Sequence, residues 1–168
     1  MKALWETDRD YLEIVQDLLV HEDVQRLAEL VHHKVTDRLT HCLNVSYRSY
    51  RVAKRLGLDA HKVARAGLLH DLFFYEGEDK HEVGGRGHNF EHPRIALRNA
   101  LKITELCEVE RDIILKHMSG ATNDVPLYPE SLLVSYMDKQ VAMMELCVGY
   151  SRRVHHFMRR VTLAWVKQ

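Results

Sequence analysis

Histidine and aspartate carry the strongest chemical signal in this sequence. Twelve histidines occur among 168 residues, and the adjacent pair His70 and Asp71 ends the nearly all-apolar stretch AGLLHDLFFY. An imidazole and a carboxylate are costly to bury without partners. A divalent metal ion would satisfy both, because imidazole and carboxylate are ordinary ligands for zinc, iron, manganese and related ions. By itself the pair is weak evidence, because a hydrogen-bonded helix end is the commoner explanation of such a dipeptide.

Four further residues of the same kind are predicted to face inward or to end a helix. His41 and Asp138 each lie at three-and-four spacing with apolar residues, which directs both side chains toward the core. His92 stands at a helix start, directly before Pro93, and His117 ends a helix. A carboxylate in the position of Asp138 requires a cation. Together these residues predict a metal site.

The elements that must position these side chains are helices. Almost every segment between turn signals has apolar residues at helical spacing, and no run alternates with a period of two. We therefore predict an all-α bundle of about seven to eight helices. The predicted helices cover 8–19, 22–32, 37–56, a segment after Asp59 that runs to His70 and Asp71, 93–102, 108–117, 129–148 and a last one capped by Ser151. Gly57 and Asp59 are the predicted stop and cap between the third and fourth.

Composition excludes several classes of protein. The 24 basic and 24 acidic residues cancel, which argues against a general binder of nucleic acid or anionic lipid. No signal peptide and no run of about 18 apolar residues is present, so we expect no membrane span and a cytoplasmic location. The three cysteines are widely spaced and are expected to be reduced thiols in the core. Residues 1–168 are predicted to form one domain.

The sequence does not decide the roles of two segments. His81 and His88 belong to the glycine-rich stretch GEDKHEVGGRGHNFEH, an expected mobile loop that either closes over a substrate or joins the metal site, or simply exposes its histidines. The arginine-rich last helix is interpreted as a solvated face, with RNA or an acidic partner as the alternative. A homo-oligomer is neither predicted nor excluded.

The order His41, His70 and Asp71, His92, His117, Asp138 resembles that of the HD-domain superfamily of metal-dependent phosphohydrolases. RLTHCLNVSYRSYRVAKRLGLD is similar to the family's first-histidine helix, and ARAGLLHDLFFYE to its His-Asp segment. EHPRIALRNA and ILKHMSG resemble the two middle histidine segments, and PESLLVSYMDK the closing aspartate. The resemblance covers most of the chain, with a motif core at about 36–148, and implies the family's all-helical fold.

The resemblance also implies a ligand set and a reaction. His41, His70, Asp71 and Asp138 would bind a first divalent ion (Mn, Fe, Co, Ni, Zn or Mg), and His92 and His117 leave room for a second. A metal-activated water would hydrolyse a small phosphorylated compound such as a nucleotide, with Asp71 holding or deprotonating that water. The positive groups nearest the ligands are candidates for phosphate binding: Arg38, Lys116 and Lys139. HDLFFYE lacks the glycine and lysine that many relatives have there, so a lysine-assisted phosphate pocket is not predicted.

Two other functions remain open in the sequence. Some members of the superfamily are di-iron oxygenases that use the same six ligands. A non-catalytic module that senses a metal or a nucleotide would also retain them.

Overall fold

The computed structural model describes the backbone of residues 4–32, 36–75 and 86–165, and their side chains except those of 31–32 and 151–165. His81 and most of the predicted glycine-rich loop lie outside these ranges. The described part contains seven α-helices, which confirms the predicted all-α class. The elements are η1 (Leu4–Thr7), α1 (Arg9–Leu19), α2 (Glu22–Gln25), η2 (Arg26–Glu29), β1 (Val31–His32), β2 (Thr36–Asp37), α3 (Arg38–Leu56), α4 (Ala60–Leu69), α5 (His88–Ile103), α6 (Glu108–Lys116) and α7 (Pro129–Trp165).

Helices α3 and α4 form the centre of the bundle. Gly57, at φ 70°, ends α3, and the side chain of Asp59 caps α4 by accepting from the amide of Lys62, as predicted. The two helices approach closely at Gly67, where an added Cβ would lie 3.0 Å from Cα of Ser46. This close approach fixes the last turns of α4 against the middle of α3.

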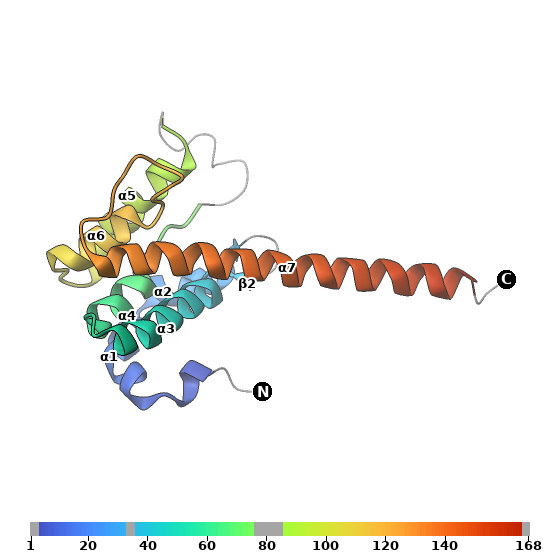
Figure 1. The fold of residues 1–168 in the computed structure, drawn as a ribbon, viewed down its shortest axis with the longest axis horizontal. Helices are drawn as coiled ribbons and strands as arrows, with labels where there is room; N and C mark the ends of the chain where they lie inside the picture. Colours follow the sequence, from blue (N-terminus) through green and yellow to red (C-terminus); the bar gives the residue numbers. More distant parts are fainter. Residues whose placement is uncertain (1–3, 33–35, 76–85, 166–168) are drawn as a thin grey trace.

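The remaining helices cover this pair. α1 packs against α4, α6 packs against α4, α5 and α7, and α7 crosses α3 before it runs beyond the body of the molecule (Figure 1). Leucine, isoleucine, valine and alanine side chains from α1, α3, α4, α5, α6 and α7 make one contiguous core. None of the described helices is both long and apolar enough to cross a lipid bilayer.

The predicted helix over 22–32 is wrong beyond Gln25. The chain tightens into η2, Leu30 is extended, and β1 then pairs antiparallel with β2 in a register that matches Val31 with Asp37. The carbonyl of Leu30 accepts from the amide of Arg38 at 2.9 Å. Contact with the start of α3 therefore overrides the helical propensity of this segment.

Two other predicted boundaries are also wrong. α5 begins at His88 and contains Pro93, because Gly87 at φ 84° starts the helix one turn earlier. The predicted break between residues 148 and 151 does not exist, since α7 is a single helix of 37 residues. One internal glycine costs a helix only about 1 kcal/mol relative to alanine, so Gly149 does not end it.

The prediction of three core thiols holds for one cysteine. Cys42 is buried in α3, whereas Cys107 and Cys147 are exposed. Cys107 lies at the N-cap of α6, and Cys147 lies on the solvent side of α7, so neither could contribute to the core.

Candidate metal centre

The six predicted ligand residues converge on one buried region at the centre of the bundle. His41 comes from α3, His70 and Asp71 from the end of α4, and His92 from α5, and all four are less than 5% exposed. His117 is the C-cap of α6, and Asp138 lies on the inner face of α7. Three groups have ligand atoms within 4.8 Å of one another: His41, His70 and Asp71; His70, His117 and Asp138; and Asp71, His92 and His117.

One end of the cluster is built around Asp138. Its Oδ1 lies 3.1 Å from Nε2 of His41 and 3.6 Å from Nε2 of His70. The same nitrogen of His70 is 3.9 Å from Oδ2 of Asp71. Two imidazole nitrogens and two carboxylates therefore face one small volume.

The other end of the cluster pairs two histidines with the second oxygen of Asp71. Nε2 of His92 and Nε2 of His117 lie 2.8 Å apart. Oδ1 of Asp71 is 3.4 Å from the first and 3.5 Å from the second. Asp71 thus directs one oxygen to each end of the cluster, which is the arrangement of a carboxylate shared by two ligand groups.

Backbone carbonyls fix the orientation of three of the imidazoles. Nδ1 of His70, His92 and His117 lies 2.8 Å from the carbonyl oxygen of Gly67, His88 and Ile114, respectively. A carbonyl oxygen only accepts, so each Nδ1 carries a proton and each Nε2 is the ring atom that faces the cluster. This is the usual outer-shell arrangement of a metal-binding histidine.

His41 differs from the other three histidines. Its Nδ1 lies 3.1 Å from Oε2 of Glu145, a buried carboxylate on α7. The sequence predicted no role for Glu145. Its position seven residues after Asp138, two turns along the same inward face, was the signal that could have identified it.

The charges of the cluster are strongly coupled. Burial opposes protonation of His41, but Asp138 and Glu145 outweigh it and raise its pKa to about 10. Burial also opposes ionisation of Asp71, yet the neighbouring histidines, His70 foremost, hold the pKa of its carboxyl well below the usual value. Burial lowers the pKa of His92 to about 3. Ionised carboxylates thus lie beside at least one neutral imidazole.

These residues fit a divalent metal ion. Nε2 of His70 and Oδ1 of Asp71 are buried, and their nearest polar neighbours in the described part of the chain are too distant for strong hydrogen bonds. Nε2 of His92 and Nε2 of His117 point at each other at 2.8 Å, and both could instead ligate a cation between them. Four imidazoles and two carboxylates are a donor set for zinc, iron, manganese, cobalt or nickel.

The three predicted phosphate-binding cations each contact protein groups. The guanidinium of Arg38 lies 3.7 Å above the Phe73 ring and donates to the carbonyl of Phe73. Lys116 pairs with Asp112 at 2.8 Å. Nζ of Lys139 donates to the carbonyl of His117 at 3.0 Å. Their role in phosphate binding stays a prediction.

A row of rings leads from the cluster to the surface. His88 stacks on His92 with ring centroids 4.4 Å apart, and its Nδ1 lies 2.9 Å from the hydroxyl of Tyr75. A cleft of about 590 Å³ opens beside His88, between the start of α5 and the segment before α7. Its lining includes Asn89 and Asn123. Sequence reasoning left His88 without a definite role and did not identify the cleft.

Comparison with known proteins gives one match. A protein-family model described as HD domain matches residues 38–143, which is more than half of the chain and includes all six clustered residues. No curated protein and no solved structure is significantly similar to the chain.

Proposed function

The chain belongs to the HD domain family, and we propose that it is a metal-dependent phosphohydrolase that acts on a small phosphorylated compound such as a nucleotide. The observation that carries this proposal is the convergence of six buried imidazoles and carboxylates into ligand groups that share Asp71. Membership of the family supports this class of reaction, and the geometry of the cluster supports the choice of residues.

We assign the metal ligands from these groups. His41, His70, Asp71 and Asp138 would hold a first divalent ion, and His92 and His117, with the other oxygen of Asp71, would hold a second. When bound, such ions lower the pKa of water toward about 7 and stabilise negative charge on phosphoryl oxygens.

Asp71 is the proposed catalytic residue. Because its pKa is held well below the usual value, the carboxylate is ionised at neutral pH and can accept a hydrogen bond from the attacking water or take its proton. The water oxygen then forms a bond to phosphorus as Asp71 takes the proton that the water loses. The bond from phosphorus to the leaving oxygen breaks, and Asp71 passes that proton to the leaving oxygen. The hydrogen bonds at Nδ1 of His70, His92 and His117 keep the site organised during these steps.

The phosphate would be held by cations beside the cluster. Lys139 is directly connected to a proposed ligand, because it donates a hydrogen bond to the backbone carbonyl of His117. Arg38 contacts Phe73, which follows Asp71 by two residues. Lys116 is already neutralised by buried Asp112, which makes it the weakest of the three candidates.

The cleft beside His88 is where we place the organic part of the substrate. It is adjacent to His92 through the stacked rings, and the amides of Asn89 and Asn123 in its lining can both donate and accept hydrogen bonds. The exposed Arg86 adds a positive charge at the same place, and the carboxylate of Asp124, also in the lining, is paired with Arg94. A polar, anionic molecule of nucleotide size suits this lining.

The test combines metal content with phosphate release. We expect one or two transition-metal ions per chain by inductively coupled plasma mass spectrometry. Reconstituted protein should release phosphate from members of a panel of nucleotides and phosphate esters. Asp71→Ala should lose hydrolysis, while Asp10→Ala, which removes an exposed carboxylate of α1, should retain it.

Three results would refute the proposal. Protein that binds no metal after reconstitution would remove the site. Metal-loaded protein that hydrolyses nothing in the panel, yet is stabilised by a nucleotide, would indicate a binding module. Oxygen-dependent turnover with an iron pair visible by Mössbauer spectroscopy would indicate an oxygenase.

A further inference from the structure

Helix α7 carries two stripes on opposite faces. The inner stripe contains Val134, Asp138, Val141 and Glu145, which are buried. The outer stripe repeats at the same spacing of three and four residues. At about 100° per residue its members lie on the side opposite the inner stripe. The outer stripe consists of Leu132, Tyr136, Lys139, Met143, Leu146 and Tyr150.

The outer stripe is apolar but exposed. Tyr136 is 60% exposed, Met143 62% and Tyr150 72%. The chain as a whole is 29% charged, yet from Ser131 to Tyr150 only Asp138, Lys139 and Glu145 carry charge. Two of these face His41. A helix face with tyrosine, methionine and leucine and almost no charge has the composition of an interface core, not of a solvated surface.

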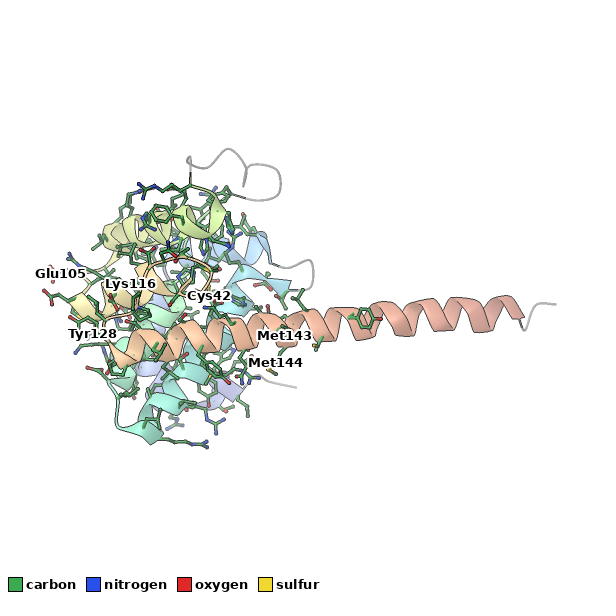
Figure 2. All side chains as sticks on the ribbon, turned by 45° about the horizontal axis from the view of Figure 1, so that its top comes forward. Cys42, Glu105, Lys116, Tyr128, Met143 and Met144 are labelled. Atoms are coloured by element: carbon green, nitrogen blue, oxygen red, sulfur yellow. The ribbon has the colours of Figure 1, made fainter. Side chains whose placement is uncertain are left out.

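The length of α7 points to the same conclusion. A helix of 37 residues is about 55 Å long, well beyond the width of the body it crosses. Figures 1 and 2 show its C-terminal part leaving the body, with Met143 and Met144 close to the point of departure. Helices without tertiary packing are marginal in water. A projecting helix with an apolar stripe therefore calls for a partner.

We propose that this stripe binds a second copy of the chain, with the two α7 helices antiparallel about a two-fold axis. Aligned in this way, Leu132 of one copy faces Tyr150 of the other, and Tyr136 faces Leu146. Each such layer joins one large ring to one leucine, which fills space evenly. Because both copies use the same surface in this two-fold pairing, no copy of that surface is left free, and the assembly is a dimer and not a filament.

The single charge on the stripe selects the antiparallel direction. Antiparallel pairing places Lys139 opposite Met143, where the lysine stem can pack and the ammonium can keep its bond to the His117 carbonyl. Parallel pairing would place Lys139 of one copy opposite Lys139 of the other, so that two positive charges would face each other in an apolar interface.

The same alignment extends beyond Tyr150. The sequence continues with Val154, Phe157 and Val161, at steps of four, three and four residues, so the stripe goes on with its heptad register shifted by one residue after Tyr150. In the dimer, this part of α7 runs toward the segment before α7 of the other copy. Val125 and Leu127 are 70% and 72% exposed there.

The first test is the mass of the full-length chain in solution. Sedimentation velocity or light scattering should give twice the 19.7 kDa chain mass, and dilution should release monomer. The double variant Tyr136→Glu with Leu146→Glu places four carboxylates in the seam and should raise the dissociation constant by more than about 100-fold. Val20→Glu, an equally apolar and exposed position at the end of α1, should leave it unchanged.

The second test is the direction of pairing. Met143→Glu places a carboxylate opposite Lys139 in the antiparallel dimer and should preserve association, whereas Met143→Lys should abolish it. In a parallel dimer, Met143 of one copy would face Met143 of the other, so both substitutions would place like charges together and disrupt the dimer. Retained circular dichroism and metal content show that each variant is folded.

Each contrary result overturns the proposal. A monomer at micromolar concentration would mean that something other than a second copy covers the stripe. A dimer that survives the double variant would mean that another surface forms it. Equal loss of association in Met143→Glu and Met143→Lys would exclude the antiparallel pairing. All of these outcomes are independent of whether the metal centre is catalytic.

Discussion

Replacing Glu145 by glutamine should weaken metal binding although Glu145 is not among the proposed ligands. Its carboxylate lies 3.1 Å from Nδ1 of His41, so it helps to determine where the proton of that imidazole resides and how strongly Nε2 donates. Three of the clustered histidines donate to neutral carbonyls, and His41 alone among the four contacts a carboxylate at Nδ1. His41 should therefore be the most basic imidazole of the set.

The magnitude follows from what glutamine can do in the same space. If the amide oxygen accepts from Nδ1, the geometry is kept and only the charge is lost. If the amide nitrogen donates to Nδ1, the proton of His41 moves to Nε2 and blocks that ligand. Loss of such an outer-shell partner costs about 10- to 100-fold in metal affinity, or about 1.4–2.7 kcal/mol.

The assay is competition between the protein and a chromophoric chelator for Co²⁺ or Zn²⁺. Glu105→Gln serves as the matched control because Glu105 is exposed and lies at the end of the body remote from the projecting part of α7 (Figure 2). The d–d absorption of the Co²⁺ complex should change in Glu145→Gln and not in the control. An affinity for Glu145→Gln within twofold of the unaltered chain would refute the reasoning, provided that the metal-free variant melts cooperatively.

The remaining predictions concern stability. Gly67→Ala should lower the free energy of unfolding by about 1–3 kcal/mol, because the new Cβ would lie 3.0 Å from Cα of Ser46; an unchanged melting temperature would contradict this close approach. Asp112→Asn should lower the free energy of unfolding by about 1.5–3 kcal/mol, because it weakens the bonds to Lys116 and to the amide of Leu127. Urea denaturation measures this difference. Burial raises the pKa of Asp112, but Lys116, with smaller contributions from Ser131 and the amide of Leu127, outweighs burial and holds this pKa below its usual value. Its stabilisation is therefore present above about pH 4 and is lost as the pH falls through the folded pKa. The free energy of unfolding, measured from pH 6 to pH 2.5 with a chelator present, should fall less steeply with decreasing pH in Asp112→Asn than in the unaltered chain. Identical slopes would exclude the pairing of Asp112 with Lys116.

Local pattern was sufficient for the helical class and for most helix boundaries. Helical periodicity, the glycine after α3 and the aspartate before α4 act over a few residues, and the structure has those boundaries where the sequence placed them. The inward direction of His41 and Asp138 followed from the same periodicity. The sequence pattern could not show that the helix over 22–32 ends early and is followed by β1, because contacts with α3 decide this. Nor could it show that α5 starts at His88, because the backbone conformation of Gly87 decides that start.

The sequence by itself determined which residues face the core and which residue types they are, because burial follows from spacing along single helices. Only the tertiary structure decided which of them meet. His41 and Glu145 are 104 residues apart in the chain, and their contact depends on the angle at which α7 crosses α3. The same crossing leaves the outer face of α7 exposed from Leu132 to Tyr150. Periodicity shows that a face is apolar, but the packing of the other helices determines whether that face is covered.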